Sequence, residues 1–173
     1  MNGLTENELH LLRTLRSLRE KLQKHSLNEF NRINPFVEDL FDWKFKGKTW
    51  SGNDNVTIYD STTLVGQVTI GDHSWIGPFC SLDGTGGLSI GSYCSISANV
   101  HIQTHDTVEW ATSGGKKPYK YAQTKIGNNC FIGVGAIILA GVTLGNSCVV
   151  GAGAVVNCSF PDNSRIAGVP ARS

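Results

Sequence analysis

A six-residue period dominates this chain from Leu64 onward. Aliphatic side chains recur at every sixth position, and glycine is the next residue after most of them. The aliphatic positions are Leu64, Ile70, Ile76 and Leu82, then Ile90, Ile96 and Ile102, then Ile126, Ile132, Ile138, Leu144, Val150 and Val156. So short a fixed repeat predicts a solenoid, the parallel β-helix, in which each hexad forms one short strand and a tight corner. Coils would stack about 4.8 Å apart and align the aliphatic side chains into interior rows. The glycines would serve corners where φ is unusual or the backbone is crowded.

The period is interrupted twice, and interruptions of a regular scaffold often carry function. Two extra residues lie between Leu82 and Ile90, in a glycine-rich stretch that predicts a small bulge or loop. Between Ile102 and Ile126 the aliphatic positions are replaced by a polar and aromatic mixture that contains His105 and several lysines. We expect residues 103–125 to form a long excursion from one corner. The predicted fold class is therefore an all-β solenoid with one long loop excursion.

The segment before the solenoid has a different character. Thr5 and Glu8 have the pattern of a capping box, so we expect a helix to begin after Thr5. An apolar stripe follows over roughly residues 6 to 25, formed by Leu11, Leu15, Leu18 and Leu22. This stripe would pack on the solenoid or on a neighbouring subunit, with attachment of the basic face to a membrane surface as the alternative.

Residues 26–50 are rich in large aromatic side chains, which predicts a lid over the first coil. Acceptor binding by these aromatics is the alternative. We therefore assign residues 1–50 to an N-terminal helical and aromatic capping segment and residues 51–173 to the β-helix domain.

Composition narrows the class of protein. A chain of 173 residues suits one such domain, and a formal net charge of +1 gives no case for nucleic-acid binding. The N-terminus has neither an apolar run long enough for a membrane span nor a secretory signal pattern, so the cytoplasm is the expected location. Four of the five cysteines occupy the same slot, four residues after an aliphatic position: Cys80, Cys94, Cys130 and Cys148. We interpret them as small buried hydrophobes, and Cys158 lies outside the slot.

Several segments of the repeat region resemble a known family. They are Ser95–His105 (SISANVHIQTH), Lys125–Asn129 (KIGNN), Gly141–Gly145 (GVTLG), Gly151–Val156 (GAGAVV) and Ala167–Arg172 (AGVPAR). Together they resemble the left-handed β-helix hexapeptide acyltransferases, within them the maltose and galactoside O-acetyltransferase type. The resemblance covers roughly residues 64 to 172. It implies a left-handed helix, acetyl-CoA as acyl donor and a homotrimer with sites between subunits.

His105 matches the catalytic histidine of that family, and its chemistry fits independently. An acceptor hydroxyl must lose a proton as it attacks a thioester, and imidazole is suited to accept that proton and return it to the leaving thiolate. No serine or cysteine stands in the context of an acyl-enzyme nucleophile, so direct transfer is favoured, with a backbone amide stabilising the oxyanion. Asp106 or Glu109 could orient the imidazole, but a plain solvated role is the alternative for each. We expect His10, His25, His73 and His101 to be bystanders.

The resemblance also implies a path for the cofactor. The matching positions are Gly133, Val134, Ala140, Gly141, Ala152, Asn157 and Arg172. Small residues would let the pantetheine arm lie along the coil edge, and Arg172 could pair with a phosphate. The chain departs from the family at Val134, where a hydroxyl residue is usual, and at Phe131, where tryptophan is usual. Candidates for contacts with the acceptor are Asp83, Asn99, Asp106 and Glu109. No metal is expected.

The leading functional hypothesis is an acetyl-CoA-dependent O-acetyltransferase that acts on a sugar hydroxyl, in polysaccharide or lipopolysaccharide synthesis. N-acetylation of a nucleotide-linked amino sugar is the alternative within the same class. A zinc enzyme of the γ-carbonic-anhydrase kind is a weaker alternative, since its three histidines would have to be His73, His101 and His105. A non-catalytic scaffold or binding module is the remaining one, and it predicts no binding of CoA.

Overall fold

The computed structural model describes residues 3–173, which divide into two compact units, residues 3–42 and Trp43–Ser173. The first unit contains α1 (Glu6–Phe30) and α2 (Phe36–Leu40), and Ser26 Oγ donates a hydrogen bond of 2.8 Å to Asp39 between them. The predicted helix and its capping box are confirmed: the Thr5 side chain accepts from the Glu8 amide, and the Glu8 carboxylate accepts from the Thr5 amide. The helix runs beyond the predicted stripe and ends at Phe30, and the next residue, Asn31, has the left-handed backbone of a common C-terminal cap.

The second unit is the solenoid, preceded by α3 (Trp43–Ser51). The backbone of α3 packs closely on the segment before β1, because a Cβ added at Gly47 would lie 2.0 Å from the carbonyl oxygen of Val56. The strands are β1 (Thr57–Ile58), β2 (Thr63–Ile70), β3 (Trp75–Ile76), β4 (Ser81–Ile90), β5 (Ser95–Ile96), β6 (His101–Ile102), β7 (His105–Asp106), β8 (Lys120–Tyr121), β9 (Thr124–Ile126), β10 (Phe131–Ile132), β11 (Ile137–Ile138), β12 (Thr143–Leu144), β13 (Val149–Val150), β14 (Val155–Val156), β15 (Arg165–Gly168) and β16 (Ala171–Arg172).

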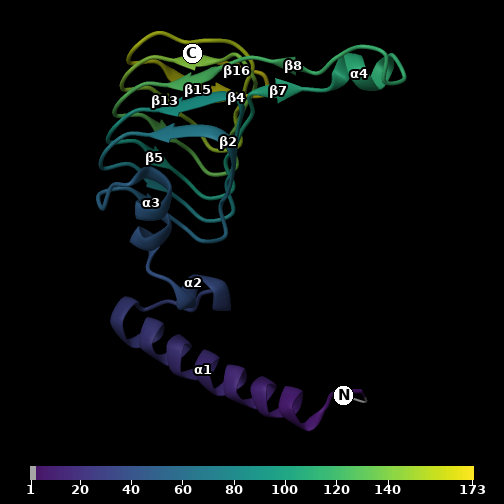
Figure 1. The fold of residues 1–173 in the computed structure, drawn as a ribbon. Coiled ribbons are helices and arrows are strands. Elements are labelled where there is room, and N and C mark those ends of the chain that lie inside the picture. Colours follow the sequence, from purple (N-terminus) through teal and green to yellow (C-terminus); the bar gives the residue numbers. More distant parts are fainter. Residues whose placement is uncertain (1–2) are drawn as a thin grey trace. The chain divides into compact units, whose positions relative to one another are not determined.

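Strands of successive coils pair in parallel and in register, which confirms the predicted β-helix of hexapeptide repeats and is consistent with the left-handed helix that the resemblance implies (Figure 1). One sheet runs β1-β3-β5-β10-β13-β15, and its aliphatic residues stack directly, as Ile76 on Ile96 and Ile96 on Ile132. These side chains are fully buried, and burial of each contributes about 1.5–3 kcal/mol. Among the described residues, none of the helices combines the length and hydrophobicity needed to cross a membrane.

The glycines that follow the aliphatic positions are there because neighbouring coils crowd them. A Cβ at Gly127 would lie 2.6 Å from the backbone of Gly145 in the next coil. The left-handed backbone at the same corner belongs instead to Asn129, two residues later, with φ of 58°. Crowding, and not unusual φ, therefore accounts for glycine at this position of the hexad.

The four cysteines of the common slot are free and buried, whereas Cys158 is exposed. Each buried thiol lies against a carbonyl of the next coil, as Cys80 Sγ does at 3.0 Å from Ser97 O and Cys148 Sγ at 3.2 Å from Pro161 O. Their interior positions fit the small hydrophobic role expected from the sequence.

Both interruptions of the period have defined structures. In the pairing of β2 with β4, Gly66 faces Gly84 and Val68 faces Leu88. One residue of β2, Gln67, therefore lies opposite three residues of β4, 85–87, and these three form a bulge in β4. The second interruption forms an arm of β7, α4 (Val108–Thr112) and β8 that projects from the solenoid (Figure 1). The coil after the arm restarts in register, with Ile102 paired to Ile138.

Candidate active site

His105 stands where the chain leaves the solenoid. It opens β7, pairs with Tyr121 of β8 across the base of the arm, and its side chain is 32% exposed. The preceding residue, Thr104, is fully buried and holds the exit in place, because its carbonyl accepts a hydrogen bond of 2.8 Å from the Ala122 amide. The two ends of the arm are thus tied together beside the imidazole.

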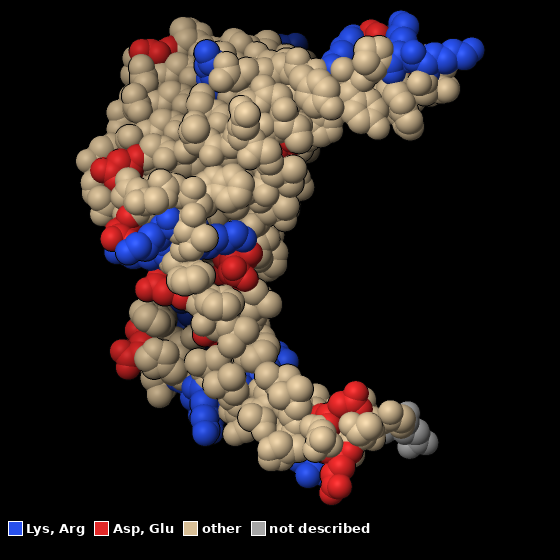
Figure 2. All heavy atoms as spheres, viewed as in Figure 1, with Lys and Arg blue, Asp and Glu red and all other residues tan. Residues whose placement is uncertain are grey.

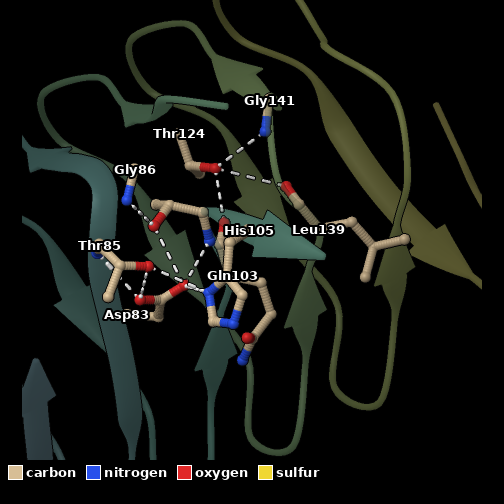
Figure 3. Close-up of polar contacts among 9 residues, drawn as sticks. Asp83, Thr85, Gly86, Gln103, His105, Thr124, Leu139 and Gly141 are labelled. Atoms are coloured by element: carbon tan, nitrogen blue, oxygen red, sulfur yellow. Dashed lines mark hydrogen bonds and ion pairs between the residues drawn. The ribbon is translucent and has the colours of Figure 1, made fainter. Parts of the chain in front are cut away.

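Asp83 of β4 faces the imidazole from the neighbouring coil. Its Oδ2 lies 2.6 Å from His105 Nδ1, and its side chain is only 10% exposed. The Thr104 amide and hydroxyl donate to the same oxygen at 2.9 and 3.0 Å. The other oxygen, Oδ1, accepts from the amide and hydroxyl of Thr85 at 2.9 and 2.7 Å. Figure 3 shows these contacts converging on the Asp83 carboxylate.

These hydrogen bonds decide the charge of the carboxylate. Burial by itself raises the pKa of Asp83, but the hydrogen bonds from Thr85, Thr104 and His105 outweigh burial and hold that pKa well below its ordinary value. Asp83 is therefore ionised at neutral pH and can only accept hydrogen bonds. Since its oxygen lies 2.6 Å from His105 Nδ1, that nitrogen carries a proton, and in the neutral imidazole the lone pair that a general base requires is then on Nε2.

The bulge in β4 places the groups that face His105. Side chains two residues apart on a strand share a side, so Asp83 and Thr85 both point toward the histidine, with glycines between and after them. The Gly86 amide donates to Thr104 Oγ1 at 2.8 Å, and a Cβ added at Gly86 would lie 2.2 Å from the Thr104 carbonyl oxygen. Glycine is thus required where the bulge touches the arm's exit.

A second threonine fixes the point where the arm rejoins the solenoid. Thr124 is fully buried, and its hydroxyl donates to the Gln103 carbonyl at 2.7 Å and accepts from the Gly141 amide at 3.2 Å. Figure 3 shows this cluster beside the Asp83 contacts. Thr85 and Thr124 were not singled out from the sequence, although the two-residue insertion near Thr85 was the available signal.

The acidic residues of the arm make other contacts. Asp106 Oδ1 accepts from the Val108 amide at 3.0 Å, which stabilises the start of α4. Glu109 forms ion pairs with Lys117 and Lys120 on the exposed arm. The carboxylate that reaches His105 is Asp83, one of the residues proposed from the sequence for acceptor contacts. Asn99 lies at a solenoid corner in a left-handed conformation, where its amide donates to the Pro78 carbonyl.

The residues proposed for the cofactor lie on two corners that flank β11 and β14. Gly133 and Val134 precede β11. Ala152 stacks against Gly133 from the next coil, because a Cβ added at Gly133 would lie 2.6 Å from the Ala152 nitrogen. Ala140, Gly141 and Asn157 lie at the other end of these strands. Arg172 belongs to β16, where Nη1 donates to the Ala171 carbonyl at 2.8 Å. Within residues 3–173, no three His, Cys, Asp or Glu side chains are grouped as a metal site would require.

Comparison with known proteins bears on the fold and on the family. The family model described as the hexapeptide repeat of succinyl-transferase matches residues 67–103 and 123–158, on either side of the arm. A solved structure of a variant of AntD, an N-acyltransferase from Bacillus cereus in complex with dTDP and coenzyme A, is 30% identical. It has a TM-score of 0.62, and the match covers 68% of each chain. The chain belongs to the hexapeptide-repeat acyltransferases.

Two further relatives add to this assignment. AntD in complex with dTDP and 3-hydroxybutyryl-CoA matches with a TM-score of 0.62 at 28% identity, over 68% of this chain and 66% of that one. Protein CapG of Staphylococcus aureus is 47% identical over 89 residues, which is 49% of this chain and 50% of CapG. The match thus spans about half the length of this curated relative. In this hexapeptide-repeat acyltransferase, the arm between the two matched blocks carries His105.

Proposed function

We propose that this protein is an acetyl-CoA-dependent O-acetyltransferase that transfers the acetyl group to a sugar hydroxyl, with His105 as general base. The observation that carries the proposal is the contact of 2.6 Å between His105 Nδ1 and the ionised Asp83. A hydroxyl is a weak nucleophile at neutral pH and needs a base to remove its proton as it attacks. An imidazole with Nδ1–H held by a carboxylate and a free Nε2 provides such a base.

The proposed reaction is a direct transfer. Nε2 of His105 accepts the hydroxyl proton while the acceptor oxygen bonds to the thioester carbonyl carbon, which gives a tetrahedral oxyanion. Collapse of that intermediate breaks the carbon–sulfur bond, and the leaving CoA thiolate receives the proton from Nε2. Asp83 keeps the ring in one tautomer and stabilises the transient imidazolium. The buried cysteines take no part, because their thiols lie inside the solenoid.

Two observations support CoA as the carrier. Val134 and Ala152 are exposed on one corner of successive coils, and a Cβ added at the neighbouring Gly135 or Gly153 would meet nothing within 4 Å, so this corner has open space for a thin pantetheine arm. AntD, which shares the fold and 30% of the aligned residues, was solved with CoA. Arg172 would pair with a phosphate of the nucleotide end. Because acetyl-CoA and nucleotide sugars are intracellular metabolites, the proposal places the reaction in the cytoplasm.

The proposed assembly is a homotrimer with each site between neighbouring solenoids. The arm of β7, α4 and β8 supports it, because this arm projects from the solenoid and leaves Trp110, Tyr119 and Tyr121 exposed (Figure 1). Its tip carries exposed lysines, visible as the basic cluster in Figure 2. A neighbouring subunit would cover these aromatics and close the acceptor pocket.

The alternative acceptor is an amino sugar linked to a nucleotide. Its support is the similarity to AntD, which is an N-acyltransferase crystallised with dTDP. A neutral amine attacks without full removal of a proton, so it depends less on the Asp83–His105 pair than a hydroxyl does. Dependence of the rate on this pair therefore discriminates between the two acceptors.

The test is an assay of thiol release by the purified full chain with acetyl-CoA and a panel of sugars, nucleotide sugars and amino sugars. We expect turnover on a hydroxyl acceptor that falls by about 10²–10⁴ in His105→Ala and is retained in the control His73→Ala, an exposed corner residue. The product should be an ester that hydroxylamine cleaves. A hydroxylamine-resistant amide would favour the amino-sugar alternative. Absence of CoA binding by calorimetry, or full activity of His105→Ala, would refute the proposal.

A further inference from the structure

The bulge in β4 presents one side chain to both members of the Asp83–His105 pair. Thr85 Oγ1 lies 2.7 Å from Asp83 Oδ1 and 3.0 Å from His105 Nδ1. It faces two partners with a single hydroxyl proton. Thr85 occupies this position because Gln67 alone faces residues 85–87, and the extra length of β4 brings the hydroxyl level with the imidazole.

Only one arrangement of protons satisfies all three groups. The ionised Asp83 has no proton to give, so the Thr85 hydroxyl donates to Oδ1 and turns its lone pairs toward the imidazole. Nδ1 of His105 then donates, and its proton is shared between Asp83 Oδ2 at 2.6 Å and Thr85 Oγ1 at 3.0 Å. The opposite tautomer would bring the bare Nδ1 lone pair against a carboxylate oxygen at 2.6 Å.

We propose that Thr85 is a positioning residue, which fixes His105 in the Nδ1–H tautomer and holds the Asp83 carboxylate against the ring nitrogen. The role rests on the proposed function of His105 as a base, because it matters only if Nε2 must be free. Thr85 holds Oδ1 through both its amide and its hydroxyl, while Thr104 holds Oδ2 in the same way. Both carboxylate oxygens are thus held by hydrogen bonds from threonines. Of these two threonines, Thr85 is the one whose hydroxyl also lies within hydrogen-bond distance of the imidazole.

The role can be separated from a packing role, because Thr85 is exposed. Thr85→Val keeps the shape of the side chain and removes only the hydroxyl, so it removes two polar contacts without opening a cavity. Thr85→Ser keeps the hydroxyl and removes a methyl group. Thr63→Val makes the same chemical change at an exposed position on the adjacent strand β2 and is the matched control.

The first readout needs no substrate. NMR of the full chain labelled with ¹⁵N-histidine, with the His105 signal assigned by its loss in His105→Ala, reports the tautomer and the exchange rate of the Nδ1 proton. We expect the Nδ1–H tautomer in the wild type and in Thr63→Val. In Thr85→Val the Nδ1 proton should exchange about tenfold faster, since loss of a charge-linked hydrogen bond weakens its protection by about that factor. Thr85→Ser should restore the wild-type rate. Thr85→Ala provides the same loss of hydroxyl should the valine variant not fold.

The second readout is kinetic. We expect kcat to fall about tenfold in Thr85→Val and Thr85→Ala with the KM for acetyl-CoA unchanged, and to recover in Thr85→Ser. A Thr85→Val protein with wild-type proton exchange and kcat would overturn the proposal, as would a serine variant that behaves like the valine one. If the Nδ1 proton behaves as expected while no acceptor is turned over by the wild type, the control of the tautomer by Thr85 stands and the proposed function fails.

Discussion

His105 Nδ1 lies 2.6 Å from Asp83 Oδ2 although 22 positions separate the two residues in the sequence. The solenoid makes this contact, because Ser81 pairs with His101 and Leu82 with Ile102 in adjacent coils. The chain then departs differently on each coil, into the bulge after Asp83 and into the arm after Thr104. The two irregularities of the repeat therefore meet at one corner, and the candidate active site lies between them.

Removing the charge of Asp83 should slow catalysis without weakening the binding of CoA. In Asp83→Asn the amide can donate to Nδ1 and favour the tautomer in which Nε2 carries the proton, so the base is lost. We expect kcat to fall by about 10²–10⁴ while the Kd for CoA, measured by calorimetry, stays within twofold. Asp106→Asn, on the arm, is the control. Equal loss of activity in both variants would contradict the assignment of Asp83.

Asp83 should also make stability depend on acid pH. Its pKa in the folded state lies below the ordinary value of about 3.9 expected in the unfolded chain, so the folded carboxylate stabilises the protein above about pH 4. This contribution is lost as the pH falls further, toward the folded-state pKa. Urea unfolding at a series of pH values should show the wild type losing its stability advantage over Asp83→Asn between about pH 4 and pH 2. An advantage that stays constant over this range would refute the prediction.

Gly86 should tolerate no side chain. A Cβ there would lie 2.2 Å from the Thr104 carbonyl oxygen, so Gly86→Ala must displace either the bulge or the exit of the arm. We expect a loss of unfolding free energy of about 3 kcal/mol and a fall in kcat, because both irregularities hold the catalytic pair. Gly52→Ala is the control, since its Cβ would meet nothing within 4 Å and its φ of 71° costs about 1 kcal/mol. Denaturant unfolding and steady-state rates would measure both effects, and equal behaviour of the two variants would contradict the crowding argument.

The tip of the arm should be dispensable for folding. Asp106 pairs with Lys120 across the ribbon, so residues 107–119 can be replaced by an Asn-Gly turn that closes a two-residue hairpin. We expect CoA affinity to be unchanged, because the proposed CoA positions lie on the solenoid. The kcat/KM for the acceptor should fall by about tenfold or more, because in the proposed trimer the tip helps to close the acceptor pocket. Loss of CoA binding in this variant would show that the tip belongs to the CoA site instead.

Thiol chemistry should separate Cys158 from the other cysteines. Burial raises the pKa of the Cys80 thiol, and Cys94, Cys130 and Cys148 are enclosed as well, so none of these four should react in the native protein. Of the five thiols, only Cys158 should react with a disulfide reagent before unfolding, and all five after it. The Cys158→Ser variant should show no native reaction. Rapid native labelling of a second thiol would contradict the interior placement.

The regular part of the fold follows from local information. The side chains of Ile96, Ile102 and Ile138 become interior because the aliphatic position of each hexad is buried, and this needs only the six-residue period. The capping box of Thr5 and Glu8 is equally local, and the structure has both. The reason for the glycines is not local, since crowding and unusual φ are alternative explanations until the neighbouring coils are placed.

What the sequence determined by itself was the solenoid, its two interruptions and His105 as the candidate base. Only the tertiary structure decided which carboxylate faces that base. Asp106 and Glu109 are near His105 in the chain, yet Asp106 bonds to the start of α4 and Glu109 pairs with lysines of the arm. Asp83 is distant in the chain and adjacent in space, because stacking of coils brings equivalent positions of successive repeats together. The six-residue period specifies which side chains point into the solenoid. The contacts between neighbouring corners depend instead on how the inserted residues of the bulge and the arm fold once the coils are stacked.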